Sequence, residues 1–277
     1  MNKARYKKIF KNKLTVIGFI IVLAFIFVAL LAPYLAPYNV YTQDLNNRLI
    51  PPEKGHIMGF DDLGRDILSR VIYGSRISLR VGIFTVTIST IFGIFVGSIA
   101  GYFGGRVDET IMRVIDILLA FPGILLAIAI ISILGPGLNN VIIALCLVGW
   151  VTYARLVRGQ ILSIKENEYV LAVKALGAST PRILVFHIIP NIISPVMIQA
   201  TLGIAGAIVG EASLSFLGLG TQAPTPSWGS MLNDGRRYIL TATHLTAFPG
   251  LAIMFVVMGF NFLGDGLRDV LDPKERI

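Results

Sequence analysis

"LTVIGFIIVLAFIFVALLA", residues 14–32, contains no charged side chain. A helix that crosses a bilayer needs about 20 mostly apolar residues, so this run predicts a membrane span. The basic stretch before it, "NKARYKKIFKNK", also resembles the start of a cleavable secretory signal. The apolar region of such a signal is shorter, about 7 to 15 residues, and the prolines of "APYLAPY" make a poor cleavage site. We therefore expect an uncleaved first span.

The whole chain has the composition of a membrane protein. Apolar residues make up 55% of its 277 residues and charged residues 14%, and the mean hydropathy is +0.75. Soluble domains carry about 25% charged residues. The net charge of +8 does not indicate nucleic-acid binding, because the basic residues cluster at the ends of apolar runs, where they orient membrane proteins. The single cysteine, Cys146, can form no intrachain disulfide.

Further apolar runs predict five more spans. The second covers Val81 to Phe103. Ile117 to Ala154 is free of charge but too long for one helix, and "LGPGLNN", residues 134–140, divides it into a third and a fourth span joined by a tight turn. The fifth runs from about Ile192 to beyond Glu211, and the sixth from about Leu245 to Gly264. Six spans place both termini on the same side of the membrane.

The distribution of basic residues predicts the orientation. The first thirteen residues include Lys3, Arg5, Lys7, Lys8, Lys11 and Lys13. Since cytoplasmic segments carry an excess of lysine and arginine, we expect a cytoplasmic N-terminus, 1–13, and a cytoplasmic C-terminus, 266–277. The intervening parts are then the first span (14–32), an outer segment (33–77) and a core of five spans (78–265). The core includes a cytoplasmic loop, 155–190.

The first half of this loop has the signals of a short helix. Ser163 and Glu166 have the spacing of a capping box ahead of it. A helix would place four side chains on one face: Tyr169, Ala172, Val173 and Leu176. Gly177 suits the left-handed position that ends a helix. The sequence therefore predicts a helix that ends at a bend.

The second half has the signals of another helix. Thr180 can cap it and Pro181 fits its first position. We expect it to end near His187, before Pro190 and Asn191 redirect the chain into the fifth span. The small side chains of the first helix would let a partner protein approach closely. An amphipathic connector lying on lipid headgroups fits the same pattern, and the residues alone leave both interpretations open.

The loop resembles the "EAA" loop of binding-protein-dependent ABC transporter permeases. That motif is Glu-Ala-Ala, three residues, Gly, nine residues, and Ile-x-Leu-Pro. Gly177 and Pro190 match its glycine and proline. Leu171, Ala172 and Val173 occupy the Glu-Ala-Ala positions, and His187 and Ile189 the Ile and Leu positions.

Four further segments resemble the C-type permease subunit of dipeptide, oligopeptide and nickel importers. They are "MGFDDLGRDILSRVIYGSRISLRVG" (58–82), "DILLAFPGILLAIAI" (116–130), "GEASLSFLGLG" (210–220) with "PSWGSML" (226–232), and "FNFLGDGLRDVLDP" (260–273). They occur in order along nearly the whole chain. The resemblance implies an all-α, polytopic fold of the type I ABC importer permease class, in a bacterial or archaeal cell (inner) membrane.

The resemblance also implies partners and a coupling site. The partners would be a different but homologous permease, two cytoplasmic ABC ATPases that use ATP, and an extracytoplasmic substrate-binding protein. Peptides are the expected cargo, and nickel or a metallophore is the alternative. The contact with the ATPase would fall on Glu168, Tyr169, Leu171, Ala172, Ala175, Leu176, Gly177, Ala178 and Ser179, with Pro190 closing the motif.

The chain lacks the motifs of an enzyme. It has no Gly-Lys pair and so no Walker A phosphate loop, and no Gly-x-Ser-x-Gly nucleophile elbow. Its three histidines, His56, His187 and His244, have no spacing that makes a metal site. We therefore expect no catalytic residue, no metal and no cofactor bound by this chain.

A proton-coupled carrier is the rival class of transporter, since it needs carboxylates inside the membrane. Asp116 and Glu211 are its candidates. Arg113, three residues before Asp116, could pair with it. Glu211 and Ser213 are candidates for lining the translocation path. Alternatively, Glu211 only satisfies backbone groups in the "GEASLSFLGLG" region.

The outer segment, 33–77, is rich in proline, glycine and charge. Within it, "DDLGRDILSRVIYG" predicts an amphipathic helix with Leu63, Ile67, Leu68 and Val71 on one side. We expect this helix to lie at the outer interface before the chain turns into the second span. The segment would pack on the partner permease and meet the binding protein, or it would be a solvated connector.

Overall fold

The structure is a computed structural model that describes residues 12–271, so the predicted cytoplasmic termini lie largely outside the described residues. The long helices are α2 (Lys13–Leu35), α3 (Ile67–Phe103), α4 (Gly105–Leu119), α5 (Gly123–Leu134), α6 (Leu138–Ile164), α9 (Ile189–Phe216) and α11 (His244–Leu271). The shorter helical elements are η1 (Leu45–Asn47), α7 (Glu168–Ala175), α8 (Thr180–Ile183), η2 (Leu184–Ile188), α10 (Trp228–Gly235) and η3 (Arg236–Tyr238).

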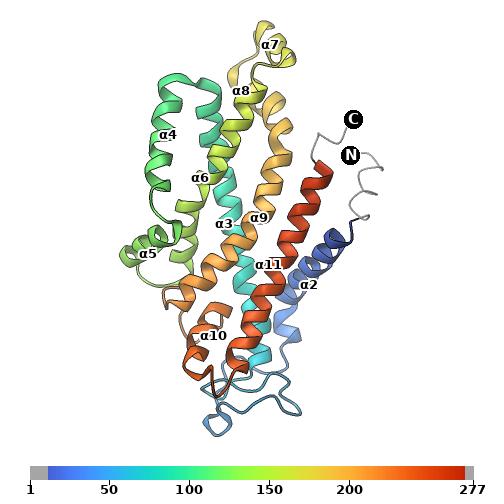
Figure 1. The fold of residues 1–277 in the computed structure, drawn as a ribbon, viewed down its shortest axis with the longest axis vertical. Helices are drawn as coiled ribbons and strands as arrows, with labels where there is room; N and C mark the ends of the chain where they lie inside the picture. Colours follow the sequence, from blue (N-terminus) through green and yellow to red (C-terminus); the bar gives the residue numbers. More distant parts are fainter. Residues whose placement is uncertain (1–11, 272–277) are drawn as a thin grey trace.

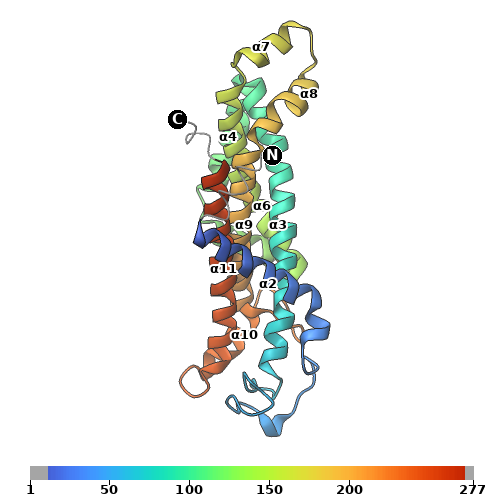
Figure 2. The ribbon, with the colours of Figure 1, turned by 90° about the vertical axis from the view of Figure 1, so that its right-hand side faces the viewer.

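The long helices form an elongated bundle. Helix α7 lies at one end, and α10 lies at the other with the segment that joins α2 to α3 (Figure 1). Helix α2 runs obliquely across the side of the bundle (Figure 2). Five helical runs are long and apolar enough to cross a membrane, and the α4–α5 pair makes a sixth if the two count as one bent span. The all-helical, multi-pass architecture is confirmed.

Helix α3 begins fourteen residues before the predicted second span. It is one continuous helix from Ile67 to Phe103, so the prediction of a separate interfacial helix was wrong. Asp66 starts it by accepting hydrogen bonds from the Ser69 amide (2.8 Å) and hydroxyl (2.7 Å). No proline interrupts residues 67–103, and a buried ion pair with Asp61 neutralises Arg70 near the start of the helix. The first, charged turns therefore continue directly into the apolar part of the same helix.

The predicted straight third span was also wrong. Helix α4 ends at Leu119, and α5 begins at Gly123 at an angle of 87° to it. Pro122 lies at this break, and a proline inside a helix would remove a hydrogen bond and clash with the preceding turn. Helix α5 has 12 residues and spans about 18 Å, too short to cross a bilayer alone.

The predicted turn between the third and fourth spans is confirmed. Helix α5 ends at Leu134 and α6 begins at Leu138. Gly135 and Gly137 adopt φ values of +87° and +146°, which favour glycine. The Asn140 side chain donates to the carbonyls of Leu134 (2.9 Å) and Gly135 (3.0 Å), so the turn closes the end of α5.

Close helix contacts depend on glycines at intervals of four residues. Along α3, a Cβ added to Gly93 would lie 2.4 Å from the Tyr153 Cβ, and one on Gly97 would lie 2.5 Å from the Ala154 carbonyl oxygen. Gly101 approaches Ile161 in the same way. Lipid provides little hydrophobic drive for helix association, so small residues that permit close packing hold membrane helices together. These contacts fix α6 against α3.

Candidate functional site

The cytoplasmic loop starts later than the sequence predicted. Helix α6 continues through Ser163, whose hydroxyl donates to the Gln160 carbonyl (2.8 Å), so the predicted capping box with Glu166 does not form. Helix α7 begins at Glu168 after Asn167. The packing of Ile161 against the end of α3 extends α6 past the local capping signal.

The bend at Gly177 is confirmed. Its φ is +81°, its amide donates to the Lys174 carbonyl (3.0 Å), and the Ala178 amide donates to the Val173 carbonyl (3.3 Å). These are the two hydrogen bonds of a Schellman motif, which ends a helix through a left-handed residue. The tip of the loop therefore has a defined exit angle.

The second helix of the loop does not end where predicted. Its N-cap is Ser179 rather than Thr180, and the chain then stays helical to Phe216. Just before Pro190, the π-helical segment η2 widens the turn, and the Ile189 amide donates five residues back to Leu184. The wider turn accommodates a proline ring, so Pro190 does not redirect the chain.

One face of α7 anchors the loop. Val170 is 2% exposed and belongs to a buried cluster with Ile161 of α6 and Ile183 and Ile188 beyond the bend. The Asn191 side chain donates to the Tyr169 hydroxyl (3.3 Å) and to the His187 carbonyl (2.7 Å). The loop is therefore fixed to the ends of α6 and α9.

The predicted contact residues lie together on the outside of this anchored tip. Exposed residues are Glu168, Tyr169, Leu171, Ala172, Ala175, Leu176, Gly177 and Ser179, and Ala178 is half-buried. Leu176 is 86% exposed. Pro190 lies apart from the tip, in the first turn of α9.

A second candidate site is a hollow of about 540 Å³ among α3, α5, α6 and α9. Aliphatic side chains provide most of its lining surface: Val86, Ile124, Leu145, Val148, Ala207 and Val209. Glycines and uncharged polar residues complete it: Thr85, Ser89, Gly123, Gly149, Thr152, Tyr153, Gln199, Gly203, Gly206, Gly210 and Ser213. Its size is within the range of ligand pockets, about 300–1,000 Å³. Hydroxyl and amide groups can hydrogen-bond a polar solute here without a fixed charge.

The two candidate path residues face different surroundings. Ser213 lines the hollow, and its hydroxyl donates to the Val209 carbonyl (2.8 Å). Glu211 has no exposed surface and does not line the hollow. It accepts a hydrogen bond from the Ser215 hydroxyl (2.6 Å), whose oxygen accepts one from the Thr221 amide (3.2 Å). Glu211 therefore reaches the backbone that follows α9 only through Ser215, and its second carboxylate oxygen, Oε2, has no hydrogen-bond partner among the described residues.

Asp116 pairs with a different arginine from the one predicted. Its carboxylate contacts Arg155 of α6 at 2.5 Å, whereas Arg113 contacts Glu109 at 2.5 Å. The Asp116 side chain is 66% exposed. An exposed, paired carboxylate of this kind is not the buried group that a proton carrier needs.

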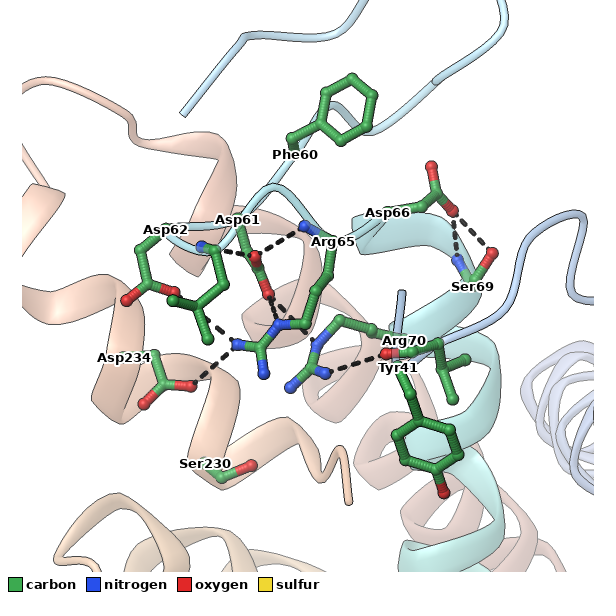
Figure 3. Close-up of polar contacts among 12 residues, drawn as sticks. Tyr41, Phe60, Asp61, Asp62, Arg65, Asp66, Ser69, Arg70, Ser230 and Asp234 are labelled. Carbon is green, nitrogen blue, oxygen red and sulfur yellow. Dashed lines mark hydrogen bonds and ion pairs between the residues drawn. The ribbon is translucent and has the colours of Figure 1, made fainter. Parts of the chain in front are cut away.

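An ion-pair cluster that was not predicted from the sequence lies at the opposite end of the bundle (Figure 3). Asp61 accepts from the Arg65 Nε at 2.6 Å and lies 3.3 Å from the Arg70 Nε. Arg65 also contacts Asp62 and Asp234 of α10, each at 3.7 Å. The Arg65 and Arg70 side chains are only 5% and 3% exposed. The cluster therefore joins the outer segment to α3 and α10.

The acidic members of this cluster differ in their surroundings. The pKa of Asp62 is raised mainly by burial and, to a smaller extent, by the neighbouring Asp61 carboxylate. Burial, then Asp62, raises the pKa of Asp234. Asp61 holds both buried arginines, whereas Asp62 has only a long contact with one. The local signals of this cluster were the spacings of Arg65 from Asp61, four residues, and from Asp62, three residues.

A multi-pass helical membrane protein with an anchored, bent loop at one end and an uncharged hollow among its helices has the architecture of a transport permease. Residues 93–277 match the family described as binding-protein-dependent transport system inner membrane component. Residues 5–52 match the N-terminal TM domain of oligopeptide transport permease C. The chain belongs to the binding-protein-dependent transport system inner membrane component family.

Relatives match nearly the whole chain. The dipeptide transport system permease protein DppC of Alkalihalophilus pseudofirmus is 50% identical and covers 97% of this chain and 88% of its own length. The oligopeptide transport system permease protein OppC of Bacillus subtilis is 45% identical, with 96% and 87% covered. The glutathione transport system permease protein GsiD of Pectobacterium atrosepticum is 44% identical, with 97% and 90% covered.

A solved structure shares the fold. The inward-facing MetNI methionine ABC transporter matches with a TM-score of 0.59 and 20% sequence identity, over 74% of this chain and 97% of the matched chain. The family is a membrane-embedded transport component and not itself an enzyme. The chain is thus a multi-pass membrane protein that serves a transport system.

Proposed function

We propose that this chain is the permease subunit of an ATP-driven importer of dipeptides and oligopeptides. The observation that carries the proposal is the hollow among α3, α5, α6 and α9, lined by aliphatic side chains, glycines and a few hydroxyl and amide groups, with no charged side chain. A peptide is polar, variable in side chain and rich in backbone groups, so a weakly polar, uncharged lining suits it. The relatives named for dipeptide, oligopeptide and glutathione transport support peptides over nickel.

The same proposal assigns the partners. A homologous permease would complete the path. Two cytoplasmic ATPases would bind and hydrolyse ATP, and one would dock on the tip around Leu176 and Gly177. A binding protein would deliver peptides to the opposite end, near Asp61 and Asp234. Both chain termini would then be cytoplasmic, on the same side as α7.

A substitution that fills the hollow tests the proposal. No atom outside its own helix lies within 4 Å of a Cβ placed on Gly206, and leucine favours a helix over glycine by about 0.8–1 kcal/mol. We expect Gly206→Leu to preserve the fold and to lower uptake of labelled peptides at least about tenfold, with tripeptides affected more than dipeptides. Uptake would be measured in cells that lack other peptide importers and express the complete transporter.

The matched control is Gly250→Leu. Gly250 is also a helical glycine with open space around its Cβ, but it lies on α11 and does not line the hollow. Peptide uptake by the Gly250→Leu transporter should equal that of the unmodified transporter when both are present in the membrane in equal amounts. Unchanged peptide uptake in both variants would contradict a path through this hollow. ATP-independent uptake that collapses with an uncoupler would instead identify a proton-driven carrier.

A further inference from the structure

A groove on the other side of α3 has no role in the function proposed above. It has a volume of about 470 Å³ and lies between α2, α3 and the chain that precedes α10. Its walls are largely apolar, with Ala29 and Leu30 from α2 and Ile83 and Phe84 from α3. Its polar members are Tyr41, Tyr73, Arg76, Arg80 and Thr225.

The two arginines carry charge that the described residues do not neutralise. Among residues 12–271, neither forms an ion pair within 4 Å. Arg76 lies over the Tyr73 ring, with its Cζ 5.9 Å from the ring centroid. Arg80 donates to the neutral Asn139 side chain (3.1 Å). Both side chains are exposed, so the groove presents two positive charges one helical turn apart.

The groove lies at the depth of a membrane interface. Arg80 is the last charged residue before α3 becomes uncharged as far as Phe103. Ala29 and Leu30 belong to the last turns of the uncharged part of α2. The apolar wall continues along α3 as a row of exposed side chains, Ile83, Phe84, Ile88, Ile91 and Phe95. A polar headgroup site thus leads directly into an apolar face long enough for an acyl chain.

We propose that this groove binds an anionic phospholipid, with Arg76 and Arg80 holding the phosphate and the α2–α3 wall holding an acyl chain. Arginine side chains form charge-assisted hydrogen bonds with phosphate oxygens, and tyrosine is favoured at the depth of the interface. The lipid would fill the groove between α2 and α3. The proposal depends on the membrane setting of α2 and α3 and not on the identity of the transported solute.

The test uses the complete importer, purified with its partners and reconstituted in phosphatidylcholine vesicles. Electron paramagnetic resonance measures how much spin-labelled phosphatidylglycerol and phosphatidylcholine the protein immobilises. We expect a preference for phosphatidylglycerol that Arg76→Gln and Arg80→Gln each lower by up to about fivefold. The double variant should show almost no preference. Arg237→Gln is the matched control, because Arg237 is exposed at the same end of the bundle but does not line the groove.

Three outcomes would overturn the proposal. The first is an unchanged lipid preference in the double variant. The second is loss of the partner permease from the purified double variant, which would show that the arginines bind acidic residues of that protein. The third is displacement of the labelled phosphatidylglycerol by excess inorganic phosphate, which would identify a site for free anions.

Discussion

Replacing Asp61 by asparagine is expected to destabilise the outer end of the permease by about 3–5 kcal/mol. Among the described residues, Asp61 is the one carboxylate that contacts both Arg65, at 2.6 Å, and Arg70, at 3.3 Å. Both arginine side chains are almost completely buried, so asparagine would leave two buried positive charges without their shared partner. Removing one member of a buried pair costs far more than removing both, because the remaining charge stays desolvated.

The loss of stability in Asp61→Asn should be measurable as a lower unfolding temperature of the purified transporter and as faster proteolysis of the segment between α2 and α3. That segment depends on the cluster, since the Arg70 guanidinium also donates to the Val40 carbonyl (3.2 Å). A second hydrogen bond, from the Trp228 indole to the Val71 carbonyl (2.9 Å), holds α10 to α3 beside it.

Asp62→Asn provides the matched control one residue away. Its pKa is raised by burial and by Asp61, so its ionised form is disfavoured in the folded state. When the pKa of a carboxyl group is higher in the folded than in the unfolded state, the group stabilises the folded protein at a pH below the unfolded pKa. This contribution is lost as the pH rises through the folded pKa. At neutral pH, Asp62→Asn should therefore be neutral or stabilising by less than about 1 kcal/mol. Equal destabilisation by both substitutions would contradict the central position of Asp61.

The second large effect is expected at Gly177. Valine there would have to adopt φ near +81°, which is unfavourable for a β-branched residue, and the strain of about 1–3 kcal/mol would reshape the tip of the loop. If the tip docks on an ATPase, this strain should lower peptide uptake about 5-fold to 150-fold. Membrane insertion should be unaffected, because a Cβ on Gly177 meets no atom within 4 Å.

Gly177→Asn distinguishes conformation from the loss of a glycine as such. Asparagine adopts the left-handed region more readily than other non-glycine residues, so this variant should retain most of the uptake. Peptide-stimulated ATPase activity of the assembled transporter should fall with uptake in the valine variant and persist in the asparagine variant. If the valine variant kept full stimulated activity, the bend would have no part in coupling.

Local patterns in the sequence predicted much of the fold and the cytoplasmic site. Uncharged runs located the membrane helices, because burial in lipid requires about 20 apolar residues wherever the helix packs. The helix end at Gly177 and the turn at residues 134–140 followed from glycines and asparagines only a few residues apart. The positions at the loop tip followed from the same spacing and from the family motif.

The predictions that failed depended on neighbours distant in the sequence. The spacing of Ser163 and Glu166 predicted a helix start, but the packing of α6 on α3 keeps Ser163 inside α6. Pro190 has the residue type of a helix breaker, yet the π-helical turn before it keeps the helix continuous. Asp116 paired with Arg155, 39 residues away, and not with its near neighbour Arg113.

The sequence by itself determined that this chain is a multi-pass helical permease with a loop that bends at Gly177, because hydropathy and helix capping act over a few residues. Only the tertiary structure decided that Glu211 is buried while Ser213 faces the hollow, and that Arg65 meets Asp234 of a helix far along the chain. Burial and charge pairing depend on which helices pack together, and that packing is set by glycine contacts between distant segments.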